Sequence, residues 1–411
     1  MTIGPDIARV AGQNVGWGAG QTTERSVGQT VEQNVGQTAE GDAGQTAGQS
    51  IARVAGQSGT RTAGQGTAQN AAREAHKNIP IFIPHVGCPH RCTFCDQRQI
   101  SGHGTFDFSR VRDEIESAVA TLPTGCRAEI AYFGGSFTAI ARERMVELLE
   151  LAQHFVDAGA VSGIRFSTRP DALSEDVLDI LTRYTVSAVE IGLQSMDDRV
   201  LSLTARGHTA AVAEDACRRV VGRGFPLVGQ MMLGLPGSDR SREMETARKI
   251  CALGASAARV YPTVVFDATP LADAWRRGEY RALTVDEAAQ RCADVMEIFE
   301  ENGVRLLRVG LCATEMPPEG GARVLAGAFH PALGEMARGV MYLRRMREGL
   351  AALTPRAGDR AIVLVARGKR SQAIGQHRGN ITALCRDFSL CGVNVREDDT
   401  LCGMQVRVLK T

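Results

Sequence analysis

The chain lacks a long apolar run, a recognisable export signal and a strong net charge. No apolar segment approaches the roughly 18 residues that span a bilayer. Thr2–Asp6 has neither the basic flank nor the apolar stretch of a secretory signal. The net charge of +1 over 411 residues gives no global attraction to nucleic acid. We therefore expect a cytoplasmic protein with no membrane partner, whose chemistry lies in local motifs.

The first 77 residues lack Leu, Phe, Tyr and Cys altogether, so this segment cannot build a packed core. Gly-Gln pairs begin at positions 12, 20, 28, 36 and 44, and then at 48, 56 and 64. A period of eight fits neither a heptad coiled coil nor a solenoid repeat of 20–50 residues. We predict a disordered, low-complexity tail over residues 1–77.

Cysteine is present in an odd number, 11, and three of these residues are clustered. Cys88, Cys92 and Cys95 have the spacing C-x-x-x-C-x-x-C, and the next cysteine is Cys126. Without an export signal, clustered thiols indicate a reducing compartment and a metal site rather than disulfides. Three thiolates this close can hold three corners of a 4Fe–4S cluster and leave one iron open. The alternative is a zinc site, whose fourth ligand would be His85 or His90.

From Asn78 onward, short apolar segments alternate with helical patterns such as Arg110–Thr121 and Arg142–Ala158. Six strand-then-helix units predict an α/β fold, a partial (β/α)6 TIM-type barrel, with a doubly wound open sheet as the alternative. In such barrels the chemistry lies at the carboxyl ends of the strands, and Cys88 follows the first strand. The six predicted strands are Ile79–Val86, Ala128–Phe133, Gly163–Ser167, Ala188–Leu193, Pro226–Leu233 and Ala257–Val265.

The chain after Gly310 has a different pattern. Helical stretches are predicted near Leu333–Leu350 and Ser371–Asp387, and strands at Ala361–Ala366 and Gln405–Leu409. We predict a core domain over residues 78–310 and a smaller C-terminal α+β domain over residues 311–411.

The cysteine run and the motifs at the strand ends together resemble the radical S-adenosylmethionine superfamily, over roughly residues 78–310. The resemblance implies a 4Fe–4S cluster on Cys88, Cys92 and Cys95, which act as the catalytic residues. S-adenosyl-L-methionine would bind the open iron through its amino and carboxylate groups. Reductive cleavage would then give methionine and a 5′-deoxyadenosyl radical. It also implies an external electron donor of the flavodoxin or ferredoxin type.

The resemblance implies a set of cofactor-binding residues at the ends of successive strands. The Gly134-Gly135-Ser136 turn corresponds to the family's contact with the methionine amino group. Gln194 corresponds to a contact with the ribose, and Arg206 to an arginine that pairs with the cofactor carboxylate. The full predicted set is Gly134, Gly135, Ser136, Ser167, Thr168, Gln194, Arg206 and Gln230.

Within the superfamily, Ile81–Cys88 and Val189–Ser195 look most like bacterial proteins related to the radical domain of the elongator catalytic subunit, which modifies transfer RNA. The roughly 100 residues after Gly310 are short for that subunit's acetyltransferase domain, so the resemblance does not extend to its net reaction. Oxygen-independent coproporphyrinogen oxidases share Gln194 and Arg206, and provide an alternative.

The C-terminal region carries one indication of substrate. Ala373–Ile381 resembles the loop with which KH domains clamp a nucleic-acid backbone, although Arg378 stands at the second glycine position. Lys369 and Arg370 add positive charge suited to phosphates. RNA is therefore a predicted partner through the C-terminal region, and the alternative function is a zinc-containing RNA-binding protein without radical chemistry. Three loosely spaced cysteines in this region could form a second metal site, with a cluster or zinc: Cys385, Cys391 and Cys402.

Overall fold

The computed structural model describes residues 76–83, 88, 92–95, 106–311 and 323–410, which all belong to one compact unit. The predicted tail over residues 1–77 lies almost wholly outside the described residues. In the part of the chain that is described, no helix is long and apolar enough to cross a membrane.

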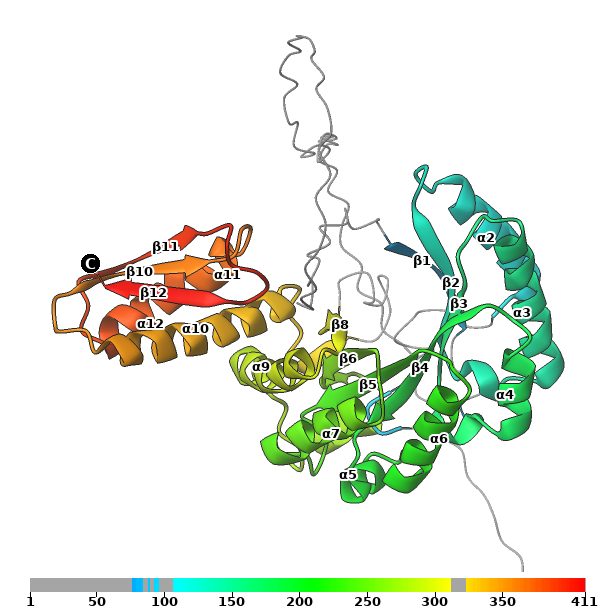
Figure 1. Ribbon diagram of the computed structural model, residues 1–411. Helices are drawn as coiled ribbons and strands as arrows, with labels where there is room; N and C mark the ends of the chain where they lie inside the picture. Colours follow the sequence, from blue (N-terminus) through cyan, green and yellow to red (C-terminus); the bar gives the residue numbers. More distant parts are fainter. Residues whose placement is uncertain (1–75, 84–87, 89–91, 96–105, 312–322, 411) are drawn as a thin grey trace, which may run out of the picture. The chain divides into compact units, whose positions relative to one another are not determined.

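A seven-stranded parallel sheet forms the first and larger part of the fold, and it curls around a concave face (Figure 1). Neighbouring strands follow the chain order, so each new strand is added at the same edge. This arrangement confirms the predicted partial barrel, with one strand more than predicted. The strands are, in sheet order, β1 (His76–Ile83), β2 (Arg127–Gly134), β3 (Ile164–Thr168), β4 (Val186–Gln194), β5 (Leu227–Leu233), β6 (Ala257–Pro262) and β8 (Arg305–Val309).

Helices between the strands cover the convex face of the sheet (Figure 1). Apolar residues at alternate strand positions face these helices and make the main core, among them Ile130, Ile191 and Met231. Tyr132 is buried in this layer, where its hydroxyl donates a 2.7 Å hydrogen bond to the Leu148 carbonyl. The helices are α2 (Val111–Ala120), α3 (Arg142–Asp157), α4 (Glu175–Leu181), α5 (Asp198–Leu203), α6 (Ala210–Gly222), α7 (Arg240–Ala252) and α9 (Val285–Glu301).

The sixth predicted strand divides in two. After β6 ends at Pro262, β7 (Val264–Phe266) leaves the large sheet and pairs antiparallel with β9 (Val324–Gly327). Gly327 has a φ of +104°, and a Cβ there would lie 2.6 Å from the Thr263 carbonyl oxygen. A glycine is therefore required where β9 pairs with Val264 at the start of β7. The helix α8 (Pro270–Arg276) follows β7.

The C-terminal part is a three-stranded sheet with order β11-β10-β12, in which β10 runs parallel to β11 and antiparallel to β12. The single helix predicted over Ser371–Asp387 is broken in two, because Gly375, His377 and Arg378 all have positive φ. A strand that the prediction missed, β11 (Gly392–Glu397), follows the second helix. The other elements are α10 (Leu333–Leu353), β10 (Arg360–Val365), α11 (Arg370–Ile374), α12 (Gly379–Asp387) and β12 (Val406–Lys410).

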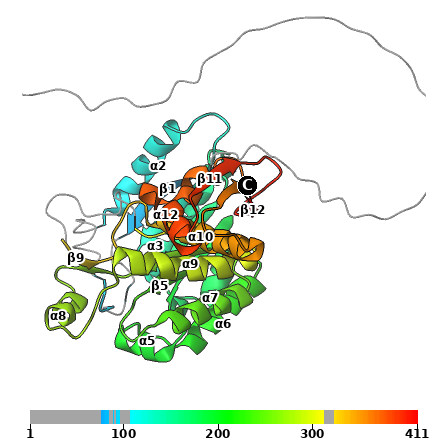
Figure 2. The same ribbon diagram turned by 90° about the vertical axis from the view of Figure 1, so that its left-hand side faces the viewer.

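Helix α10 joins the two cores. Leu333, Ala337 and Met341 pack into the core of the large sheet, whereas Met346 and Leu350 pack against the small one. It also lies beside α9, as both ribbon views show (Figures 1 and 2). The boundary predicted at residue 311 stays a prediction, since α10 contributes to both hydrophobic cores.

Candidate active site

The segment carrying Cys92 and Cys95 is held at the carboxyl edge of the sheet by backbone hydrogen bonds. The Thr93 N–H donates to the Thr204 carbonyl over 3.1 Å, and the Thr93 carbonyl accepts from the Leu271 N–H over 2.9 Å. The Cys95 N–H closes a tight turn onto the Cys92 carbonyl, at 3.1 Å. The end of α5 and the first turn of α8 thus hold both sides of this short segment.

Arg206 connects the cysteine segment to the fourth strand. Its Nη1 donates to the Cys92 sulfur over 3.1 Å, and its Nη2 donates to the Gly192 carbonyl over 2.6 Å. Only 6% of the arginine is exposed. A Cβ on Gly192 would lie 2.9 Å from the Gln194 side-chain nitrogen, so the missing side chain leaves room for Gln194 beside the guanidinium. Gly192, Gln194 and Arg206 therefore form one packed group next to Cys92.

Cys88 is half-buried, and two arginines lie near its thiol. Burial, with the neighbouring Cys92, raises the pKa of Cys88, while the charges of Arg169 and Arg206 and a backbone hydrogen bond from Ser136 lower it. The net pKa lies above the ordinary value, so burial outweighs the two arginines. Thiolates are the metal-binding form of cysteine, and Arg169 and Arg206 are the nearby cations that favour that form.

The predicted residues Ser136 and Thr168 meet, and both are buried. Their hydroxyl oxygens lie 3.0 Å apart, and Thr138 is 2.6 Å from Thr168. The Ser136 hydroxyl also accepts the backbone N–H of Arg169 over 3.2 Å. These side chains thus hydrogen-bond to one another and connect the end of β2 to the end of β3.

Gly134 ends β2 with a φ of +105°, a conformation that side-chain-bearing residues rarely adopt. A Cβ there would lie 2.9 Å from the carbonyl oxygen of Ile83, the last residue of β1. The backbone of Gly134 therefore passes closely by the strand that leads into Cys88. Gly135 follows it and is half-buried.

Several buried polar atoms around this edge have no hydrogen-bond partner among the described residues: Gln194 Oε1, Arg206 Nε, Thr93 Oγ1 and His208 Nε2. Unsatisfied buried groups are costly, and a concentration of them is typical of a binding site that awaits a polar ligand. Ser167 and Gln230 are half-buried on the concave face, where Ser167 pairs with Glu190 in register and Gln230 pairs with Gly192. The donors and acceptors here fit a zwitterionic cofactor beside a thiolate-bound cluster.

The described residues form no complete metal site. Within these ranges, no three His, Cys, Asp or Glu side chains lie close enough together to hold a metal ion. Cys385, Cys391 and Cys402, all described, likewise form no such group. His85 and His90, the fourth ligands of the zinc alternative, lie outside the described residues.

The sequence-based prediction missed a chain of buried charges on the concave face. Glu129, Arg165, Glu190 and Arg259 alternate in sign and come from β2, β3, β4 and β6. The signal that was available is a single charged residue between apolar neighbours inside a strand, as in Val189-Glu190-Ile191.

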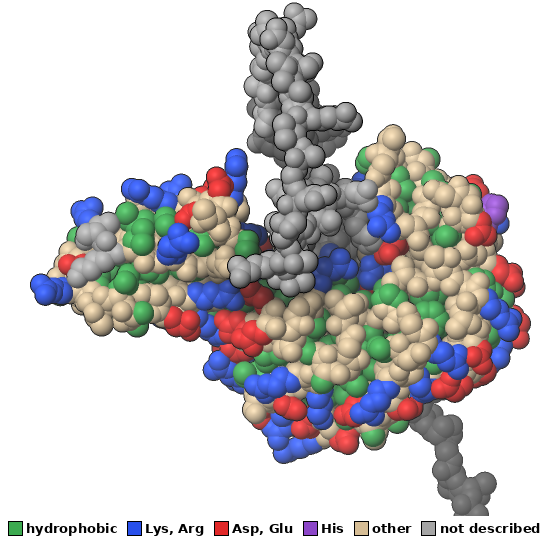
Figure 3. All heavy atoms as spheres, in the orientation of Figure 1, with side chains coloured by type: hydrophobic (Ala, Val, Ile, Leu, Met, Phe, Trp, Pro, Cys, Tyr) green, Lys and Arg blue, Asp and Glu red, His purple; other side chains and the backbone are tan. Residues whose placement is uncertain are grey.

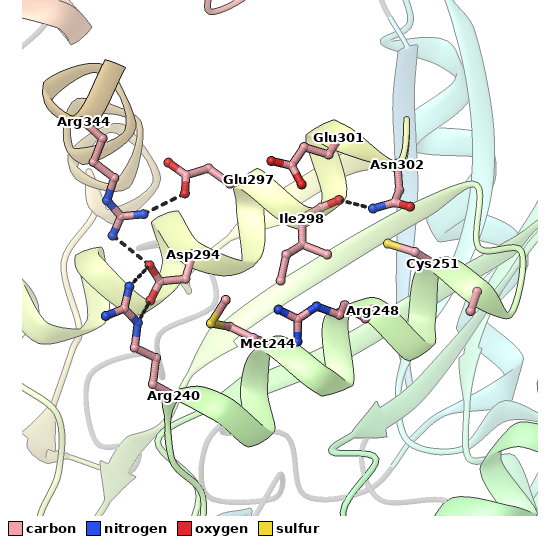
Figure 4. Close-up of a pocket in the computed structure, with 11 residues that line it drawn as sticks. Arg240, Met244, Arg248, Cys251, Asp294, Glu297, Ile298, Glu301, Asn302 and Arg344 are labelled. Atoms are coloured by element: carbon pink, nitrogen blue, oxygen red, sulfur yellow. Dashed lines mark hydrogen bonds and ion pairs between the residues drawn. The ribbon is translucent and has the colours of Figure 1, made fainter. Parts of the chain in front are cut away.

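A surface cavity of about 700 Å³ lies between α7, α9 and α10 and shares no residue with the cysteine site (Figure 4). At its centre, the buried carboxylate of Asp294 lies 2.6 Å and 2.7 Å from Arg240 and 2.7 Å from Arg344. Glu297 also pairs with Arg344, at 2.8 Å. The opposing charges on these walls are thus paired with one another.

A partial barrel with a cysteine loop at its carboxyl edge, an arginine on one thiol and unsatisfied polar atoms around it is the arrangement expected of a cluster-dependent radical enzyme. Family models place the chain within that class. The model described as the radical SAM superfamily matches residues 82–250, and the radical SAM C-terminal domain matches residues 255–344. The chain belongs to the radical S-adenosylmethionine superfamily. It is an enzyme of that superfamily, whose members use a 4Fe–4S cluster and S-adenosylmethionine.

Individual relatives agree with this placement. An uncharacterised protein of Methanocaldococcus jannaschii is 30% identical over 231 residues, which cover 53% of this chain and 70% of that protein. A tRNA uridine(34) acetyltransferase of Methanocaldococcus infernus is 24% identical over 253 residues, 52% of this chain and 47% of that protein. Among solved structures, the N-terminally truncated Elp3 of Methanocaldococcus infernus superposes with a TM-score of 0.51 at 20% identity, covering 67% of this chain and 64% of that one. The structural likeness supports the shared fold.

Proposed function

We propose that Cys88, Cys92 and Cys95 hold the 4Fe–4S cluster and leave one iron open for S-adenosylmethionine. The observation that carries this proposal is the 3.1 Å hydrogen bond from Arg206 to the Cys92 sulfur. If Cys92 holds the cluster, Arg206 would stand next to it and could receive the cofactor carboxylate by two-point hydrogen bonding.

The remaining predicted residues surround this position. We assign the backbone of Gly134 and Gly135 to the cofactor's amino group, since Gly134 ends β2 and Gly135 follows it at the carboxyl edge of the sheet. Ser136 and Thr168 position that turn through their mutual hydrogen bond. Gln194, whose Oε1 has no partner among the described residues, and the half-buried Ser167 and Gln230 are assigned to the ribose and adenine side.

When bound, the cluster supplies one electron and S-adenosylmethionine supplies a 5′-deoxyadenosyl radical for hydrogen abstraction from the substrate. An external reductant of the flavodoxin or ferredoxin type would deliver that electron. The protein's own residues orient the cofactor and keep water away from it. A cytoplasmic location is part of the proposal, since the ten described cysteines are all free thiols.

Anaerobic reconstitution tests the proposal directly. We expect about four irons per chain, and 5′-deoxyadenosine from S-adenosylmethionine once dithionite is added. Zinc in place of iron after purification would favour the alternative of a zinc-containing RNA-binding protein. A cluster that forms without ever cleaving the cofactor would contradict the enzymatic part.

We further propose that the substrate is RNA, held by the C-terminal part of the chain. The observation that favours it is the chain order β10–α11–α12–β11, in which β10 pairs parallel with β11 and a tight loop joins the two helices. In that loop His377 and Arg378 both have left-handed backbones and exposed side chains. The buried Asn380 donates to the Gly339 and Ala373 carbonyls over 2.8 Å and 3.0 Å, which fixes the loop to α10 and α11.

The arrangement matches the loop between two helices through which KH domains clamp a nucleic-acid backbone. The similarity to a tRNA uridine(34) acetyltransferase makes transfer RNA the first RNA to test. We expect a single-stranded RNA oligonucleotide to bind the chain, and Arg378→Gln with Lys369→Gln to weaken that binding and lower its salt dependence. Exposed Arg356, on the loop before β10, provides the matched control variant Arg356→Gln.

Comparing the modified nucleosides of transfer RNA from cells with and without the protein would identify the reaction. An unchanged nucleoside profile, with no RNA binding, would shift the substrate to a small molecule. The coproporphyrinogen-oxidase-like alternative would then be tested with the porphyrinogen itself.

A further inference from the structure

Arg169 is a buried arginine at the carboxyl edge of the sheet, where it directly follows β3. On the visible face of the molecule, basic and acidic side chains are interspersed (Figure 3), and exposed ion pairs of that kind contribute little to stability. Arg169 has only 4% of its surface exposed, so its donors need partners within the protein. These partners lead to two residues beside the cysteines.

The side chain of Arg169 joins two segments of the chain. Its Nε and Nη2 donate to the two carboxylate oxygens of Asp171, over 2.9 Å and 3.0 Å. Nη2 carries two hydrogens, and it also donates to the backbone carbonyl of Arg206. The two-point pairing with Asp171 fixes the plane of the guanidinium, so the bond to Arg206 has a preset direction.

The loop that carries Arg206 has a backbone that needs support. Ala205 and Gly207, on either side of Arg206, have φ of +52° and +75°. A left-handed backbone is costly for alanine, and it persists only where the surrounding structure holds it. The bond from Arg169 to the carbonyl of Arg206 provides such a hold. The side chain of Arg206 in turn donates to the Cys92 sulfur.

The backbone of Arg169 leads to the other cysteine. Its N–H donates to the Ser136 hydroxyl over 3.2 Å. The backbone of Ser136 is in turn a hydrogen-bond donor to Cys88. Arg169 thus supports the donor to Cys88 through its main chain and the donor to Cys92 through its side chain.

We propose that Arg169 is a positioning residue that holds the hydrogen-bond donors to Cys88 and Cys92 in place, and thereby raises the reduction potential of a cluster bound there. Donors to the sulfurs stabilise the electron that a cluster gains on reduction, so they help to set its potential. Asp171 pairs with the charge of Arg169, so the effect depends on where the donors stand more than on net charge. The inference rests on the proposed function in one respect, that these cysteines hold a 4Fe–4S cluster.

The first measurement needs no cluster. Amide hydrogen exchange of the cluster-free full chain is compared in wild type, Arg169→Gln, Arg169→Lys and the control Arg305→Gln, since Arg305 is exposed at the start of β8. The N–H groups of residues 204–206 bond to carbonyls of α5, and we expect them to exchange about tenfold faster in both Arg169 variants. Lysine keeps the charge but cannot hold Asp171 at two points and also reach the Arg206 carbonyl. Arg305→Gln should match wild type.

The second measurement is the midpoint potential of the cluster in the reconstituted chain, by redox titration followed by electron paramagnetic resonance. We expect both Arg169 variants to keep about four irons per chain and to have a lower potential. The expected shift is about tenfold in the reduction equilibrium, which is about 59 mV for one electron. Arg305→Gln should leave the potential unchanged.

The potential separates positioning from a merely structural role, because a residue that only supports the fold changes stability without moving the potential of the folded molecules. Arg169→Lys carries both measurements if Arg169→Gln does not fold. Loop exchange at the wild-type rate, or a wild-type potential, in the Arg169 variants that fold overturns the inference. Iron content and 5′-deoxyadenosine formation in wild type report on the proposed function separately.

Discussion

The guanidinium of Arg206 lies 3.1 Å from the sulfur of Cys92, although 113 residues separate the two in the sequence. The same guanidinium donates to the Gly192 carbonyl, so the fourth strand and the cysteine loop together fix its position. A guanidinium held in this way can provide a receptor for a carboxylate.

Replacing Arg206 should therefore affect cofactor binding more than cluster assembly. We expect Arg206→Gln to bind about four irons but to bind S-adenosylmethionine roughly 10- to 100-fold more weakly, since a charge-assisted hydrogen bond contributes about 1.5–3 kcal/mol. Arg206→Lys should restore little, because an ammonium cannot make the two-point contact. Equilibrium dialysis measures the affinity, and Arg305→Gln is the control. Wild-type affinity in Arg206→Gln would contradict the assignment.

The three loop cysteines should each be required for iron. We expect Cys88→Ala, Cys92→Ala and Cys95→Ala each to lower the iron content from about four to below one per chain after reconstitution. Cys391→Ala should leave it unchanged, since Cys391 is exposed and belongs to no group of potential metal ligands among the described residues. Iron and sulfide analysis provides the measurement. Full iron content in any of the three loop variants would remove that cysteine from the ligand set.

Much of this arrangement was predictable, because the spacing of three cysteines and the apolar strands ending in polar motifs are local patterns. The ends of parallel strands meet at one edge, so motifs distant in sequence were expected to converge. The charge network was not predictable in the same way. Whether Glu190 and Arg259 pair depends on how far the sheet curls, and no local pattern encodes that. The break at Gly375–Arg378 was missed because apolar periodicity continues on both sides of it.

Gly134 should be intolerant of a side chain for two reasons, its positive φ and its close contact with β1. Gly125 has a positive φ of +77° but nothing within 4 Å of its would-be Cβ, so it isolates the backbone effect. We expect Gly125→Ala to lower the free energy of unfolding by about 1 kcal/mol, and Gly134→Ala by roughly 1–3 kcal/mol more. Denaturant unfolding gives both values. Equal losses in the two variants would show that the contact with Ile83 costs nothing.

The buried His208 should make the stability of the fold depend on pH. Burial, followed by the charge of Arg206, lowers the pKa of His208 from 6.5 to about 4, and its Nε2 has no partner among the described residues. The unfolded chain therefore binds more protons than the folded chain between these two values, so the stability contributed by the neutral imidazole is present above pH 6.5 and is lost as the pH falls towards 4. Between pH 7.5 and 5.5 this loss amounts to about 1 kcal/mol.

Urea unfolding of cluster-free protein at both pH values should show this loss in wild type and not in His208→Gln, which keeps a polar side chain but cannot titrate. The comparison between the two proteins cancels the contributions of every other titrating group. An equal pH dependence of stability in both proteins would contradict this expectation. It would mean that His208 takes up its proton in the folded chain as readily as in water, and that its imidazole is more open to solvent than its exposed fraction of 8% indicates.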